Sequence, residues 1–388
     1  MDKQIQKDPG KQETDRDLRE NNQAENTNEQ AESDRKNRRW VRNIPLLIVE
    51  ICVLVAAVVI MYVVVTTTDE VERKDIDKEQ ILVNEEVKET HKREEQENRN
   101  VSRGYRNIAL FGVDARDGQL GKGTRSDTII IASINQDTQE IKLVSVFRDT
   151  YLNLSNDTYN KCNVAYAQGG PEQAISMLNT NLDLDITDYV TVGFGGLIDS
   201  VDALGGIEME VTDAEISHLN NYQLTMSEEL GVDYIPVEHS GKQLLNGMQA
   251  TAYCRIRYTK GDDFRRAERQ RDVLTAMMEK AKKASVSSLR DMVLAILPEV
   301  ETSLGVNEIV SVLGSVAGYN VVASDGFPFE DGRVGATVGS RGSCVIPDNL
   351  EKNVVELHRL LYPETDYNPS RQMKGISEEI EALTAEYR

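Results

Sequence analysis

A long apolar run near the N-terminus constrains this chain more than any other feature. Residues Leu46 to Val65 read LLIVEICVLVAAVVIMYVVV, and Glu50 is the one ionisable residue among them. A helix of roughly 20 apolar residues crosses the hydrocarbon core of a bilayer, and Glu50 lies near enough to one end to reach the headgroups. The run starts far into the chain and lacks a small-residue cleavage site, so residues 44–66 are predicted to be an uncleaved transmembrane helix rather than a signal peptide.

Charged residues on the two sides of this run set its expected orientation. Basic residues crowd the N-terminal side, at Arg35, Lys36, Arg38, Arg39 and Arg42, and acidic residues begin the other side at Asp69. Basic flanks stay in the cytoplasm, so we expect a single-pass cell-membrane protein with an extracytoplasmic C-terminal domain. Residues 1–43 hold almost no large apolar side chain, which predicts a disordered cytoplasmic tail. Residues 67–102 are predicted to be a charged stalk.

The charge and the cysteines narrow the possible functions. A formal net charge of -21 argues against a nucleic-acid-binding role, and no helix-turn-helix or RNA-binding motif occurs. The cysteines show no CxxC or Cys/His spacing, which argues against a zinc site. An oxidising exterior permits one disulfide among Cys162, Cys254 and Cys344. We expect Cys162 to pair with Cys254, and the alternative is three buried free thiols.

Strand and helix patterns alternate from Asn107 onward. Runs rich in Ile, Val and Leu predict strands at 107–113, 127–134, 140–147, 187–194 and 207–211. Apolar periodicity and helix-end signals predict helices at 171–182, 195–206, 262–284 and 350–361. Such alternation is typical of an α/β fold. We therefore predict a three-layer α-β-α domain with a central mixed sheet over residues 103–365, followed by a C-terminal tail at 366–388.

A glycine-rich segment between two predicted strands, residues 112–128, carries the first cluster of polar residues. Asp114 and Asp127 offer the carboxylate oxygens that Mg2+ prefers. Arg116 and Arg125 beside them can each present a bidentate fork to a phosphate. The alternative is that all four are surface turn residues with local ion pairs. No GxxxxGK[ST] sequence occurs, so a nucleotide-binding P-loop is not predicted.

Two short segments add further charged residues. Arg148 and Asp149 follow directly on a predicted strand, where a purely structural ion pair is also a reasonable interpretation. Lys161 lies in a loop before a predicted helix, whose N-terminus could itself face an anion. Each segment alone is weak evidence for a binding site.

The segment from Tyr253 to Arg271 is the most informative. We predict a strand at 253–258, which would place Arg255 and Arg257 on one face. Arg266 and Gln270 lie one turn apart on the next predicted helix. A solvated basic face is the alternative for three other arginines of this helix, Arg265, Arg269 and Arg271. So many like charges repel each other unless a counter-anion binds between them. The whole set of arginines, lysine and carboxylates fits a diphosphate better than a single phosphate or a carboxylate substrate.

In these residues and their order, the chain resembles the LytR-CpsA-Psr family of bacterial wall-polymer ligases. The motifs that carry the resemblance are GVDAR with TRSDT, SVFRDTY, KCNVAYAQGG and CRIRYTKGDDFRRAERQR. The resemblance implies an α-β-α fold behind a transmembrane anchor. It also implies phosphotransfer of teichoic acid, capsular or other secondary polymers from undecaprenyl pyrophosphate to peptidoglycan.

Carried over residue by residue, the resemblance assigns roles to the charged side chains. It implies an Mg2+ ion at Asp114 and Asp127, and pyrophosphate binding by Arg116, Arg125, Arg148, Lys161, Arg255, Arg257, Arg266 and Gln270. The catalytic candidates are Asp114, Asp127, Arg148 and Asp149, with Asp127 or Asp149 as the general base. The chain departs from the family pattern at Arg265, where Gly is usual, and at Ala267, where a polar residue is usual. The alternative to an Mg2+-dependent phosphotransferase is a non-catalytic receptor or scaffold for lipid-linked or anionic wall polymers.

Overall fold

The computed structural model describes residues 72–73, 78–96, 104–113, 120–257, 262–285, 289, 299–304 and 316–387. The predicted tail at 1–43, the predicted transmembrane helix at 44–66, and the side chains of Asp114 and Arg116 lie outside these residues. Among the helices that are described, none combines the length and the apolar character that a membrane crossing requires. All described residues fall within one unit of the chain, Thr67–Arg388.

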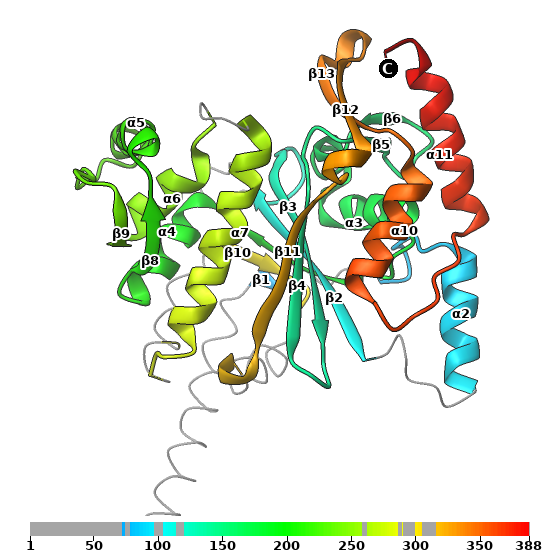
Figure 1. Ribbon diagram of the computed structural model, residues 1–388, viewed down its shortest axis with the longest axis horizontal. Helices are drawn as coiled ribbons and strands as arrows, with labels where there is room; N and C mark the ends of the chain where they lie inside the picture. The colour runs from blue at the N-terminus through cyan, green and yellow to red at the C-terminus, as the bar shows by residue number, and fades with distance from the viewer. Residues whose placement is uncertain are drawn as a thin grey trace, which may run out of the picture. The chain divides into compact units, whose positions relative to one another are not determined.

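A seven-stranded mixed sheet forms the centre of this unit (Figure 1). In spatial order its strands are β1 (Glu72–Arg73), β10 (Val300–Thr302), β7 (Asp188–Val192), β2 (Tyr105–Val113), β3 (Ser126–Asn135), β4 (Glu140–Val146) and β11 (Asn320–Phe327). Strands β2, β3 and β4 form an antiparallel meander, while β7 runs parallel to β2 and β11 parallel to β4. The predicted mixed sheet is confirmed. Its central strands are rich in Ile and Val because β-branched side chains pack well on a sheet that is covered on both faces.

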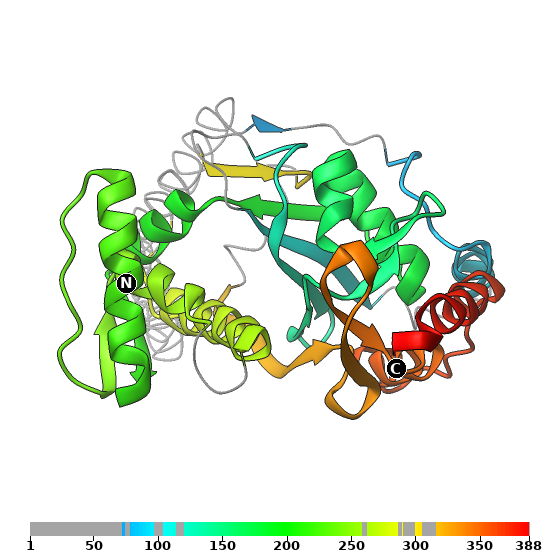
Figure 2. The same cartoon turned by 90° about the horizontal axis from the view of Figure 1, so that it is seen from above.

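Helices cover both faces of the sheet, as Figure 2 shows from above. Phe111, Ile129 and Val144 pack on one face against α3 (Asn163–Leu182), α10 (Leu350–Leu361) and α11 (Arg371–Thr384). On the other face, Ile130 and Leu143 pack against α7 (Asp262–Ala281). A separate cluster joins α4 (Phe194–Ala203), α5 (Asp213–Leu230) and α6 (Gly247–Arg255) to the hairpin of β8 (Ile207–Val211) and β9 (Gly241–Leu245).

The folded unit extends past both predicted boundaries. Residues 366–388 were predicted to be a tail, but α11 buries Met373, Ile376 and Ile380 in the main core. Helix α2 (Glu85–Gln96) begins inside the predicted stalk, and Ile81 just before it is also a core residue. Apolar side chains at helical spacing in 373–380 explain why α11 docks rather than remaining solvated.

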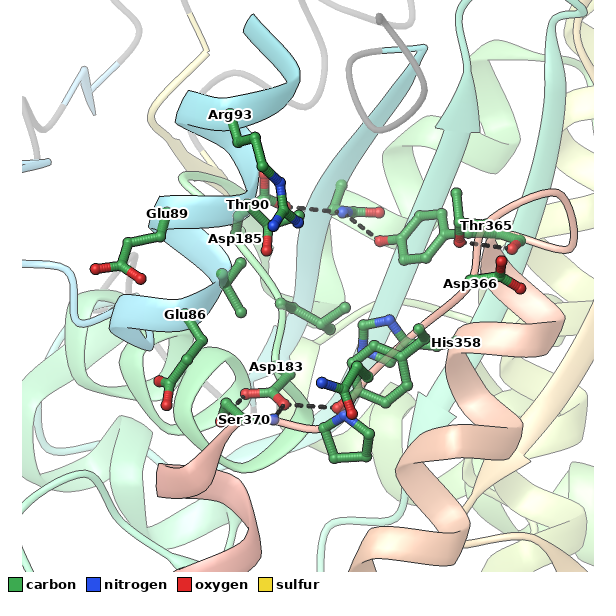
Figure 3. Close-up of a pocket in the computed structure, with 17 residues that line it drawn as sticks. Glu86, Glu89, Thr90, Arg93, Asp183, Asp185, His358, Thr365, Asp366 and Ser370 are labelled. Carbon is green, nitrogen blue, oxygen red and sulfur yellow. Dashed lines mark hydrogen bonds between the residues drawn. The ribbon is translucent and has the colours of Figure 1, made fainter. Parts of the chain in front are cut away.

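A pocket of about 370 Å3 lies where these two added segments meet (Figure 3). Asp183, which ends α3, accepts hydrogen bonds from the Ser370 hydroxyl at 2.6 Å and from the Tyr367 hydroxyl at 2.6 Å. The side-chain amide of Asn84 also donates to Asp183. One buried carboxylate therefore ties the segment before α2 to the segment before α11.

The prediction of a strand near Tyr253 is wrong. Residues 253–258 do not form a strand, because α6 continues to Arg255 and the chain becomes extended only at Ile256. A capping box between Asn246 and Gln249 starts that helix, and its residues from Gly247 to Cys254 are all buried. Tertiary burial has overridden the β propensity of the sequence.

The predicted disulfide between Cys162 and Cys254 is also wrong. All three cysteines of the described domain are free and buried. Cys162 belongs to the main core beside the sheet, whereas Cys254 belongs to the separate cluster around α5 and α6. The thiol of Cys162 instead donates to the backbone carbonyl of Phe147, at 3.2 Å. The alternative of three buried thiols is confirmed.

Candidate anion-binding site

A pocket of about 380 Å3 opens at one end of the sheet and gathers residues from five parts of the chain. Asp127 lies at the start of β3, and Arg148 follows the end of β4. Arg257 lies in the link after α6, and Arg266 lies in the first turns of α7. Gln270 also lines the pocket, as do residues of the hairpin formed by β12 (Arg333–Thr337) and β13 (Ser343–Pro347). The antiparallel run of β3 and β4 brings the first two side chains together, since the start of one strand adjoins the end of the other.

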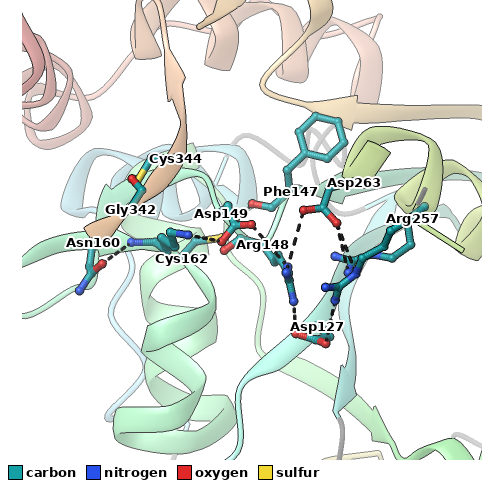
Figure 4. A network of polar contacts seen from close by, with 12 residues as sticks. Asp127, Phe147, Arg148, Asp149, Asn160, Cys162, Arg257, Asp263, Gly342 and Cys344 are labelled. Atoms are coloured by element: carbon teal, nitrogen blue, oxygen red, sulfur yellow. Dashed lines mark hydrogen bonds and ion pairs between the residues drawn. The ribbon is translucent and has the colours of Figure 1, made fainter. Parts of the chain in front are cut away.

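Alternating charges form a closed ring in this pocket (Figure 4). Arg148 donates to Asp127 with an Nη1 to Oδ1 distance of 2.7 Å, and its Nη2 lies 3.9 Å from Asp263 Oδ2. Arg257 also lies between the same two carboxylates, 3.7 Å from Asp127 Oδ2 and 3.7 Å from Asp263 Oδ1. Each arginine therefore faces two carboxylates, and each carboxylate faces two arginines.

A second branch of the network connects Lys161 to the ring. Lys161 ends β6 (Tyr159–Lys161), which pairs with β5 (Tyr151–Asn153). Its ammonium group lies 2.9 Å from Asp149 Oδ1, and the other oxygen of Asp149 lies 3.5 Å from Arg148 Nε. Asp149 thus bridges Lys161 and Arg148, and the structure brings these three predicted residues into one charged network at the pocket wall.

Arg266 is the most deeply buried cation of the pocket, with 5% of its surface exposed. Its Nη1 lies 3.2 Å from Asp263 Oδ1, and its Nε finds no hydrogen-bond partner among the described residues. Burial lowers the pKa of Arg266 to about 10; Asp263 opposes this shift, while Arg148 and Arg257 add to it. The guanidinium remains charged at pH 7 and keeps a donor free, which suits it to bind an anion.

The carboxylates act on Arg148 in the opposite direction. Burial alone would lower the pKa of Arg148, but Asp127, Asp149 and Asp263 outweigh burial and raise that pKa above its usual range. The three nearby carboxylates therefore favour the charged form of Arg148.

Arg255 does not join this ring. Its guanidinium lies over the rings of Phe194 and Tyr222, at 4.8 and 5.5 Å from their centroids, and its buried Nη1 finds no hydrogen-bond partner among the described residues. Because α6 ends at Arg255, this side chain and Arg257 do not share the strand face that the sequence predicted. Arg125 is exposed just before β3.

The alternative of a solvated basic face on α7 is wrong for two of its three arginines. Arg269 is only 1% exposed and forms an ion pair of 2.8 Å with Glu215 of α5. Arg271 is buried too, and its Nε donates to the hydroxyl of Ser324 on β11 at 2.8 Å. These two arginines fix α7 to its neighbours, and α7 in turn positions Arg266.

Sequence reasoning missed Asp263 as a residue of the site. The sequence placed Asp263 only within the predicted helix at 262–284. Its three-residue spacing from Arg266 was the available signal, because residues at i and i+3 are neighbours on a helix surface. Phe264 was missed as well; its ring packs edge-on against Phe147 with centroids 4.6 Å apart and helps to line the pocket.

A divalent metal ion has few protein ligands among the described side chains. No group of three or more His, Cys, Asp or Glu residues in the described ranges could hold one. Asp127 alone of the two predicted ligands is described, and its carboxylate already faces Arg148 and Arg257. Mg2+ is commonly bound by one or two carboxylates together with water and substrate phosphate oxygens, so Asp127 on the pocket wall fits that role.

The protein is a mixed α/β domain, and the arginines that converge at one end of its sheet suit a phosphorylated or other strongly anionic ligand. The family model LytR_cpsA_psr matches residues 75–338, so the chain belongs to the LytR_cpsA_psr family. The resemblance seen in the motifs is confirmed.

Individual relatives agree with this assignment. The chain is 34% identical over 209 residues to a polyisoprenyl-teichoic acid–peptidoglycan teichoic acid transferase, TagU, of Enterococcus faecalis, a match that covers 53% of this chain and 63% of TagU. The chain therefore spans less than two thirds of that relative. The solved structure of Bacillus subtilis TagV is similar with a TM-score of 0.52 and 26% identity, covering 68% of this chain and 98% of TagV. A structure of TagT bound to LI-WTA shares the fold, with a TM-score of 0.53 and 21% identity. The match covers 67% of this chain and 90% of TagT.

Proposed function

We propose that this protein is a phosphotransferase that moves a glycan phosphate from an undecaprenyl pyrophosphate carrier to peptidoglycan. The glycan would be a teichoic acid, a capsular polysaccharide or another secondary wall polymer. The observation that carries this proposal is the convergence of Arg148, Arg257 and Arg266 on one pocket, with Arg266 retaining an unpaired buried donor. The names of the relatives support it, since TagU and TagV are teichoic acid transferases.

The arginines would bind the diphosphate and stabilise the charge that develops as its bridging P–O bond breaks. The bond that forms joins the glycan-side phosphorus to a sugar hydroxyl of peptidoglycan, and polyprenyl phosphate leaves with the electrons of the broken bond. The hydroxyl proton passes to a carboxylate, and Asp127 and Asp149 are the candidates because both line the pocket. Lys161 holds Asp149 in place at 2.9 Å.

We include Mg2+ in the proposal, held by Asp127 together with Asp114. When bound, the ion would neutralise phosphate charge beside the arginines. The side chain of Asp127 is 30% exposed on the pocket wall, which leaves room for a ligand to reach it. We also propose that residues 44–66 anchor the domain to the outer side of the cell membrane, where a polyprenyl carrier is available.

A transfer assay tests the proposal. The full-length protein in detergent micelles is mixed with Mg2+, a synthetic polyprenyl pyrophosphate glycan and peptidoglycan oligomers, and the products are followed by mass spectrometry. We expect a phosphodiester-linked product that disappears in Arg257→Ala and with a chelator. Arg265→Ala is the matched control, because Arg265 pairs with Glu268 at 2.6 Å and does not line the pocket.

The same assay separates the second class of function. A protein that binds the lipid tightly but neither transfers nor hydrolyses it would be a receptor or scaffold for lipid-linked wall polymers. Loss of product in Arg265→Ala to the same extent as in Arg257→Ala would show that the pocket is not the site of transfer.

A further inference from the structure

The two carboxylates of the charged ring are held very differently. Asp127 accepts a hydrogen bond of 2.7 Å from Arg148. Asp263 lies 3.2 Å from Arg266, 3.7 Å from Arg257 and 3.9 Å from Arg148, and its Oδ1 has no hydrogen-bond partner although it is buried. Asp263 is therefore attracted to three arginines without making a well-formed hydrogen bond to any of them.

Asp263 lies near one end of its helix, and part of its side chain reaches solvent. It is the second residue of α7, and its side chain is 40% exposed. Asp127, by contrast, belongs to β3 in the middle of the sheet. A rotation of the Asp263 side chain towards solvent would uncover the three arginines without disturbing the sheet.

The arginines need an anion in this position. Arg148 and Arg257 are close enough to Arg266 to disfavour its charge, and Asp263 offsets part of that repulsion. A guanidinium binds an oxyanion best through two parallel hydrogen bonds, a geometry that Asp263 does not achieve with Arg257 or Arg266. A phosphate group with three oxygens can achieve it.

We propose that Asp263 is an internal competitor of the substrate: its carboxylate occupies the anion position between Arg257 and Arg266 until a diphosphate displaces it. The inference rests on the proposed function, since the displacing ligand is the diphosphate of the polyprenyl carrier. This competition weakens the binding of every anion to the three arginines. A diphosphate can contact all three arginines at once, so it displaces Asp263 more readily than a single phosphate or another small anion does.

The test measures binding of inorganic pyrophosphate and of inorganic phosphate to the full-length protein in detergent micelles, by calorimetry in metal-free buffer. Asp263→Asn should bind both anions more tightly. Three partly exposed ion pairs together correspond to about a tenfold decrease in Kd. The matched control is Glu268→Gln, which removes one carboxylate from the same helix outside the pocket and should leave both Kd values unchanged.

The outcomes distinguish this inference from the proposed function. Unchanged or weaker pyrophosphate binding in Asp263→Asn, with normal binding by the unaltered protein, would overturn the competitor role and leave the diphosphate site intact. Absence of pyrophosphate binding by the unaltered protein would overturn both. If Asp263→Asn does not fold, as judged by circular dichroism, Asp263→Ser is measured instead, because serine also suits a helix N-terminus.

Discussion

Replacing Arg269 by methionine should destabilise the domain strongly. Arg269 is 1% exposed, and its guanidinium donates to Glu215 at 2.9 Å and to the backbone carbonyl of Ile256 at 3.1 Å. Methionine carries no charge, so the buried carboxylate of Glu215 loses its ion-pair partner. Breaking a buried ion pair by removing one partner costs about 3–5 kcal/mol. The loss should be at the upper end of that range only if the backbone carbonyl of Ile256 also stays unsatisfied.

Urea unfolding of the full-length protein in micelles, followed by circular dichroism, measures this change. Double replacement of Arg269 by methionine and Glu215 by leucine should recover part of the stability, because it removes both charges together. The capping box between Glu215 and Thr212 limits the recovery, since leucine also removes that cap. A loss below about 1 kcal/mol for Arg269→Met would refute the reasoning, because that magnitude is typical of an exposed pair.

Three further predictions concern the core, the pH dependence and the pocket. Met373→Ala should destabilise the protein by about 2–5 kcal/mol in the same urea assay, whereas Leu383→Ala on the exposed side of α11 should have little effect. Burial lowers the pKa of His358 to about 4, whereas in the unfolded chain this side chain has its ordinary pKa of about 6.5. Between these two pH values the unfolded state binds a proton that the folded state does not. Stability should therefore fall as pH drops from about 6.5 towards 4, and should fall less in His358→Gln. Arg257→Lys keeps the positive charge but cannot make two parallel hydrogen bonds to a phosphate, so pyrophosphate affinity measured by calorimetry should fall about tenfold. An unchanged Kd would contradict a bidentate contact.

The central strands could be predicted from the sequence because their environment is simple. β2, β3 and β4 are covered on both faces, so nearly every residue from Ile108 to Val113 and from Ile129 to Ala132 must be apolar. The helix at 350–361 could be predicted for a similar reason, since its apolar residues recur at helical spacing. Local pattern was sufficient wherever a segment contacts one uniform core.

Features that depend on distant neighbours could not be predicted in the same way. The residues from Tyr253 to Tyr258 alternate as in a strand, yet the first three of them are helical. They belong to α6, which begins after the cap at Asn246 and packs against α4 and α5. Cys162 and Cys254 are close to similar motifs in the sequence but belong to different cores. Only the tertiary arrangement separates them.

The candidate site was predicted in part. The order of motifs indicated Arg148, Lys161, Arg257 and Arg266, which the structure does bring together. Arg255 was expected beside Arg257, but the end of α6 turns it towards Phe194. Whether a charged residue at a helix start faces a pocket depends on how that helix is packed, and this is why sequence reasoning missed Asp263.

The most direct test of the proposed diphosphate site is a structure of the protein with a polyprenyl pyrophosphate bound. We expect the two phosphate groups to lie between Arg148, Arg257 and Arg266 and to accept hydrogen bonds from all three. We also expect the unpaired Nε of Arg266 to donate to one of the phosphate oxygens. Phosphates bound elsewhere, with the ring of Asp127, Arg148, Asp263 and Arg257 still closed, would contradict it.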